Sequence, residues 1–230
     1  MKRREAVNSS VVDTSTQPNK HSSPLWLRIG FWICIVIAVA AVLRRVVALA
    51  YPPRSAPPQM AGLDNVFASH TALTLAHILP ALAFVVVAPF LYIRRNARWP
   101  ERLLFPLGLV VGITAYAMSI YPVGGWVELS AVLFFNSLFL FSLARAWWER
   151  NDQQMKMQWL TRAIAVLLGI ATTRPVMGIF FATSQLTHLK PQDFFGYAFW
   201  IGFSINTVIV ELWLRSRPRF QPESLVQIVN

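Results

Sequence analysis

Residues 68–93 read ASHTALTLAHILPALAFVVVAPFLYI, an apolar run that contains no Asp, Glu, Lys or Arg. As an α-helix, about 20 such residues cross the roughly 30 Å hydrocarbon layer of a bilayer. Five other segments share this length and apolar character, approximately residues 26–51, 103–121, 127–147, 163–183 and 194–214. No strand-like alternation or internal repeat is evident. The sequence therefore predicts an all-α, polytopic membrane helix bundle with six transmembrane helices.

The composition of the whole chain agrees with this fold class. Its 230 residues are 55% hydrophobic and only 13% charged, whereas about 25% of residues are charged in soluble domains. This composition excludes a large soluble enzyme domain. Three parts are expected: a polar, disordered cytoplasmic tail at residues 1–24, a six-helix transmembrane domain at 25–214, and a second cytoplasmic tail at 215–230.

The basic residues indicate an orientation in the membrane. The chain has 21 Lys and Arg against 10 Asp and Glu, a net charge of +11. Because they lie between apolar segments, they point to topology and to anionic lipid head groups rather than to nucleic acid. Sixteen of the 21 fall on one side of the six spans, and only Arg44, Arg45, Arg54 and Lys190 fall on the other, with Arg174 inside a span. The positive-inside rule then predicts a cell inner-membrane protein with both termini cytoplasmic.

The second predicted span carries a polar stripe. His70 and His77 are seven residues apart, which places them within about 20° of one helix face, and Thr74 lies between them. Ionisable groups are costly in lipid, so this stripe is expected to point into the bundle. Interhelical hydrogen bonding and the binding of a proton, ligand, metal or haem are the alternatives for it.

The fifth predicted span carries Arg174 directly before Pro175, which cannot donate the helical hydrogen bond of its turn. A guanidinium at this depth is costly to bury without a partner. In one interpretation Arg174 satisfies the freed carbonyl groups, pairs with one buried acceptor and fixes helix register. In the other it lines a polar pocket that opens to the outside. The candidate ligand-binding residues of that pocket are His70, His77, Glu128, Asn136 and Arg174.

Several short elements follow one another in a suggestive order between residues 68 and 214. They are Leu75-Ala76-His77-Ile78, Arg98-Trp99, Arg102, Gly124-Gly125, Trp159, Arg162, Thr172-Thr173-Arg174 and Glu211-Leu212-Trp213. Together they resemble the predicted bacterial multi-pass membrane proteins grouped as domain of unknown function twenty-three-oh-six. The resemblance implies the multi-pass architecture and adds no activity.

The chain departs from that family pattern at two positions. The family usually places one histidine directly before the Arg-Trp pair and another shortly before the tryptophan that precedes the fifth span. Here Ala97 and Lys156 stand at these positions. If the two histidines bind a metal or move protons in relatives, this chain lacks that function or works differently.

Three classes of function stay open. The first is binding of a small molecule or ion in the outward pocket, as a carrier-like module or a sensor. The second is a membrane b-type cytochrome, with haem held by His77 and His188, or by His77 and Met118, because His70 and His77 on one straight helix cannot supply opposite axial ligands. The third is a non-catalytic scaffold that packs with another membrane subunit or with a second copy of the chain.

Catalysis is not favoured by any motif. The sequence contains no Gly-x-Ser-x-Gly elbow, no His-Glu-x-x-His and no Gly-rich phosphate loop. Its single cysteine, Cys34, excludes an intrachain disulfide and a Cys-based metal site.

Overall fold

The computed structural model describes residues 24–50, 68–93, 99–188 and 191–216. Six helical stretches within these residues are long and apolar enough to cross a membrane, and the described residues contain no strand. The predicted all-α bundle of six spans is confirmed, while nearly all of both predicted tails lies outside the described residues. The helices are α1 (Leu25–Ala50), α3 (Thr71–Val87), α4 (Phe90–Ile93), α5 (Trp99–Met118), α6 (Gly125–Trp148), α7 (Gln153–Thr187) and α8 (Pro191–Arg215).

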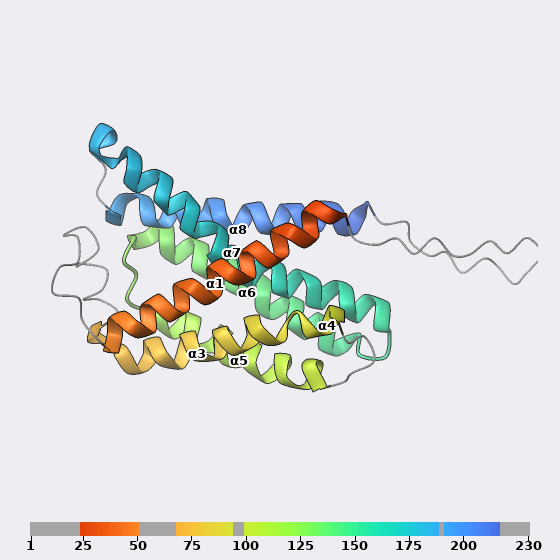
Figure 1. Ribbon diagram of the computed structural model, residues 1–230. Coiled ribbons are helices and arrows are strands. Elements are labelled where there is room, and N and C mark those ends of the chain that lie inside the picture. Colours follow the sequence, from red (N-terminus) through yellow and green to blue (C-terminus); the bar gives the residue numbers. More distant parts are fainter. Residues whose placement is uncertain (1–23, 51–67, 94–98, 189–190, 217–230) are drawn as a thin grey trace, which may run out of the picture.

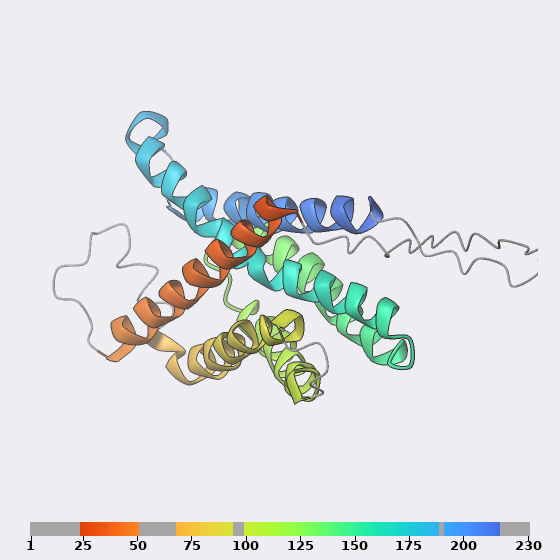
Figure 2. The same cartoon turned by 45° about the vertical axis from the view of Figure 1, so that its right-hand side comes forward.

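Successive spans run in alternate directions, with α3 and α4 together forming the second span. The start of α1 and the end of α8 consequently lie at the same end of the bundle (Figure 1). Helices α6, α7 and α8 pack against one another, and α5 packs on both α3 and α6. Helix α1 runs obliquely across the bundle and contacts both α3 and α7 (Figure 2).

Helix α7 is longer at both ends than the span predicted at residues 163–183. It begins at Gln153 because the Asp152 carboxylate caps it, accepting hydrogen bonds from the backbone N–H groups of Gln154 at 2.9 Å and Met155 at 3.0 Å. It ends at Thr187, where His188 takes a left-handed backbone conformation with φ of 54°. Hydropathy identifies only the apolar part of a helix, so it does not reveal this polar extension.

Helices α7 and α8 approach closely through small residues. A Cβ atom on Gly202 would lie 2.6 Å from the backbone nitrogen of Thr173, closer than real Cβ contacts. In the same contact, Thr172 Oγ1 donates a hydrogen bond of 2.7 Å to Asn206 Oδ1. Close backbone approach and interhelical hydrogen bonds are the forces expected between membrane helices, because lipid tails are as apolar as the helix surfaces.

Gly202→Ala is therefore expected to lower the free energy of unfolding by about 1–3 kcal/mol, since the added methyl group presses on the backbone of Thr173. Gly178→Ala is the matched control, because a Cβ at Gly178 meets no atom within 4 Å. That control should be neutral, or more stable by up to about 1 kcal/mol through higher helix propensity. Thermal unfolding in detergent measures both. Equal effects of the two substitutions would contradict the close approach.

Ion pairs join three helices at the end of the bundle that holds the start of α1. Glu211 of α8 accepts hydrogen bonds from the Nε atoms of Arg162 and Arg215, each at 2.8 Å. Lys156 of α7 pairs with Glu101 of α5 at 2.8 Å, and both side chains are largely buried. These contacts fix the relative positions of α5, α7 and α8.

Candidate functional site

A cavity of about 270 Å³ lies between the long helices. Most of its wall is apolar, as in typical small-molecule pockets, and its volume is just below their usual range of about 300–1,000 Å³. A few polar and charged side chains from different helices interrupt the apolar wall. They are Arg44 and Arg45 from α1, Thr74 and His77 from α3, Ser119 and Tyr121 after α5, Glu128 and Asn136 from α6, and Arg174 from α7.

Four of the five candidate residues from the sequence line this cavity: His77, Glu128, Asn136 and Arg174. His70 does not. It lies before the first turn of α3, with a non-helical φ of −121°, so the seven-residue helical spacing to His77 does not apply to it. Its ring stacks on Tyr121 with centroids 4.0 Å apart. His70 therefore contacts the cavity wall through Tyr121 and does not line the cavity itself.

Three of the polar wall residues are held by neighbouring helices or turns. The Nδ1 atom of His77 and Thr114 Oγ1 are 3.0 Å apart and share a hydrogen bond, which links α3 to α5. Asn136 Nδ2 donates to the carbonyl oxygen of Gly112 at 2.9 Å, which links α6 to α5. Glu128 Oε2 accepts from the backbone N–H of Gly124 at 2.6 Å, at the start of its own helix. These hydrogen bonds fix the orientation of the three side chains and satisfy part of their hydrogen-bonding capacity.

Arg174 differs from these residues. In the described part of the chain, its Nε atom is buried and has no hydrogen-bond partner. His77 and Glu128, two of the acceptors expected near it, bond to Thr114 and to the backbone N–H of Gly124, and Asn136 donates its amide to Gly112. Helix α7 continues through Pro175, yet Nε of Arg174 bonds to no carbonyl freed by that proline. A buried donor without an acceptor is costly, more so when it carries charge.

Arg44 and Arg45 are wall residues that sequence reasoning treats only as topology signals. They lie near the C-terminal end of α1, and both line the cavity. Together with Arg174 they place three guanidinium groups on the wall of one cavity. The signal in the sequence is the interruption of an apolar span by two adjacent arginines, because such residues in a span usually face a bundle interior or an aqueous cavity.

Of the two ligand pairs considered for haem, the structure places one on the cavity wall and not the other. Met118 lines the cavity together with His77. His188, in contrast, is an exposed residue that caps the C-terminus of α7 and does not line the cavity. Among the described residues, no group of three or more His, Cys, Asp or Glu side chains could hold a metal ion. The pair His77 and His188 is therefore not brought together.

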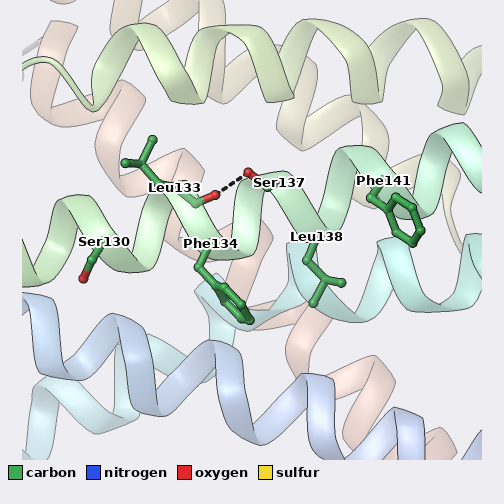
Figure 3. Close-up of a pocket in the computed structure, with 6 residues that line it drawn as sticks. All are labelled: Ser130, Leu133, Phe134, Ser137, Leu138 and Phe141. Atoms are coloured by element: carbon green, nitrogen blue, oxygen red, sulfur yellow. Dashed lines mark hydrogen bonds between the residues drawn. The ribbon is translucent and has the colours of Figure 1, made fainter.

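A second, shallow pocket lies along the surface of α6 (Figure 3). Its only polar side chains are two serines. Ser137 Oγ donates to the carbonyl oxygen of Leu133 at 2.6 Å, and Ser130 Oγ accepts from the indole nitrogen of Trp200 at 3.2 Å. Both hydroxyl groups already have partners, and the remaining lining is Leu and Phe. Such a surface suits contact with lipid acyl chains, so the interior cavity is the stronger candidate for specific binding.

No family model, curated protein or solved structure matches this chain. Its class therefore rests on its own helices. Within the described residues, six helices are long and apolar enough to span a membrane, and their length is sufficient to cross a bilayer. The chain is an integral, multi-pass membrane protein.

Proposed function

We propose that this protein binds a small molecule or ion in the interior cavity, acting as a carrier-like module or a sensor. The observation that carries the proposal is Arg174: it lines a cavity whose apolar wall carries a few polar side chains, and its buried Nε has no partner among the described residues. A bound ligand that accepts hydrogen bonds would remove this cost. Intramembrane ionisable residues commonly mark such sites.

The orientation belongs to the same proposal. Arg102 and Arg145 lie near the ends of α5 and α6, Arg150 lies between α6 and α7, and Arg162 lies in the first third of α7. These ends of α5, α6 and α7 are at the same end of the bundle as the start of α1. The positive-inside rule assigns that end to the cytoplasm of an inner membrane, where these residues also contact anionic head groups. The wall arginines of α1 then lie toward the outer side, which supports access to the cavity from outside.

We also propose that the chain is related to the family grouped as domain of unknown function twenty-three-oh-six. At the second position where the chain departs from the family pattern, Lys156 forms a largely buried ion pair with Glu101 at 2.8 Å. The chain thus has a structural contact where relatives are expected to carry an imidazole.

Blocking the cavity tests the proposed function. Ala115 lines the cavity, whereas Ala76 is exposed on α3 and does not line it. We expect Ala115→Phe to weaken the affinity for any ligand of the cavity at least tenfold, because the phenyl ring occupies the ligand's space. Ala76→Phe should leave the affinity unchanged. The measurement is thermal unfolding of the purified full chain across a panel of amino acids, sugars, organic acids, phosphate, polyamines and metal ions. A stabilising solute acts through binding to the folded state.

Two results would contradict this function. One is a panel in which no solute raises the unfolding temperature of the wild-type chain. The other is a stabilising solute that acts equally on wild type and Ala115→Phe, because its site would then lie elsewhere.

The cytochrome alternative has one observation in its favour, the presence of His77 and Met118 on the same cavity wall. A visible absorption spectrum of the gently purified protein, before and after dithionite, decides it. A Soret band that shifts on reduction would favour the cytochrome. If the cavity binds a colourless solute instead, the purified protein should show no Soret band. After haem is added and unbound haem is removed, the protein should still show none.

A further inference from the structure

We infer that the ligand of the interior cavity is an anion, carrying a carboxylate or phosphate group that binds Arg174. This inference rests on the proposed function and names the chemical class of its ligand. Two independent observations carry it: the balance of charged groups on the cavity wall, and the hydrogen bonds that those groups already make.

The charge on the wall is predominantly positive. Arg44, Arg45 and Arg174 line the cavity, and Glu128 is the only carboxylate among the described wall residues. The three guanidinium groups come from two helices, α1 and α7, and face one cavity. In an interior of low dielectric constant, like charges repel far more strongly than in water. An anion placed among the three guanidinium groups would convert this repulsion into attraction, whereas a cation would add to it.

The hydrogen bonds lead to the same class of ligand. The Glu128 carboxylate is engaged by the backbone N–H of Gly124 at 2.6 Å, and no ion pair between Glu128 and Arg174 is found in the described residues. The Arg174 guanidinium therefore keeps its donors for another acceptor. Its planar fork matches the oxygen atoms of carboxylates and phosphates, which bind it through two parallel hydrogen bonds. Asn136 uses one amide hydrogen on Gly112 and has a second to offer.

The anionic group can come from a dissolved anion or from a lipid head group. Both present the same oxygen atoms to Arg174, and both reach a cavity between membrane helices. The small volume of about 270 Å³ accommodates a phosphate or a short dicarboxylate, or the phosphate portion of a head group whose acyl chains stay in the bilayer.

The test follows thermal unfolding of the full chain in detergent at constant ionic strength. The probes are inorganic phosphate, succinate, a short-chain phosphatidylglycerol and the matching phosphatidylcholine. At saturation we expect at least one anionic probe to raise the unfolding temperature by roughly 3 °C. A rise with phosphate or succinate identifies a dissolved anion, and a rise with phosphatidylglycerol but not phosphatidylcholine identifies a lipid head group.

Variants locate the effect at Arg174. Arg174→Gln should abolish the rise, and Arg174→Lys, which keeps the charge but loses the fork, should weaken the affinity about tenfold. The control for the dissolved anions is Arg102→Gln, which removes the same charge from an exposed position outside the cavity and should leave a rise with phosphate or succinate unchanged. For phosphatidylglycerol the control is Ala115→Phe, because Arg102 is itself expected to contact head groups. If Arg174→Gln does not fold, Ala115→Phe keeps all three arginines, occupies the cavity and should also abolish the rise.

The results separate this inference from the proposed function. Stabilisation by a neutral or cationic solute that Ala115→Phe abolishes would overturn the anionic ligand and leave the binding function standing. An anion effect that is equal in wild type, Arg174→Gln and Ala115→Phe would overturn the inference. So would the absence of any rise with the four probes.

Discussion

Glu101→Ala is expected to lower the free energy of unfolding by about 3 kcal/mol, because it leaves the ammonium group of Lys156 buried without its partner. The two side chains form an ion pair of 2.8 Å between α5 and α7, with only 9% of Lys156 and 19% of Glu101 exposed. Such burial prevents water from replacing the lost carboxylate. Unfolding by urea or by a denaturing detergent, followed by circular dichroism, measures the change.

Two further variants identify the cause of that loss. Glu101→Ala combined with Lys156→Met should recover most of the stability, because removal of both charges leaves no unpaired group. Glu149→Ala breaks an ion pair with Arg145 that is considerably more exposed, at 38% and 26%, and should change the stability by less than about 1 kcal/mol. A double variant that is as unstable as Glu101→Ala would show that the carboxylate acts through another contact.

Leu104→Ala is expected to lower the free energy of unfolding by about 2 kcal/mol, at the lower end of values for core leucines in soluble proteins. Leu104 of α5 is fully buried in the largest apolar cluster of the bundle. Lipid is as apolar as a protein core, so transfer of the side chain contributes little in a membrane. The loss comes from van der Waals contacts around the cavity that the smaller side chain leaves.

The same helix supplies the control. Leu109 of α5 is 55% exposed on the outer surface of the bundle, where lipid can fill the space of a removed side chain. Leu109→Ala should therefore change the stability by less than about 0.5 kcal/mol. If the two substitutions cost the same, the buried side of α5 at Leu104 and the exposed side at Leu109 would not differ in their contribution to stability. Both variants can be compared by thermal unfolding in one detergent.

The apolar runs predicted the six spans because the thickness of a bilayer imposes one length on every crossing helix. The start of α7 at Gln153 depends instead on a side-chain cap, and hydropathy does not record the Asp152 carboxylate that provides it. Asp152 is nevertheless visible in the sequence as a residue favoured at N-caps. Helix ends outside the apolar layer thus require capping signals in addition to hydropathy.

The candidate site was predictable only in part. His77, Glu128, Asn136 and Arg174 are polar residues in apolar spans, and the cost of burying them is sufficient to predict that they face the interior. Their distribution of hydrogen bonds follows from tertiary packing, as with the 3.0 Å contact between His77 and Thr114. The approach of α1 to α7 also comes from packing, and it adds Arg44 and Arg45 to the cavity.

The length of α7 has a consequence for the surface of the membrane. Its 35 residues extend about 52 Å at 1.5 Å per residue. To fit within the ~30 Å hydrocarbon layer, the helix would have to tilt by about 55°, beyond the usual range of up to about 40°. On the order of a dozen residues must therefore lie in the head groups or in water, and the C-terminal end of α7 indeed extends away from the other helices (Figure 1). Helix α7 is therefore expected to continue as helix beyond the hydrocarbon layer.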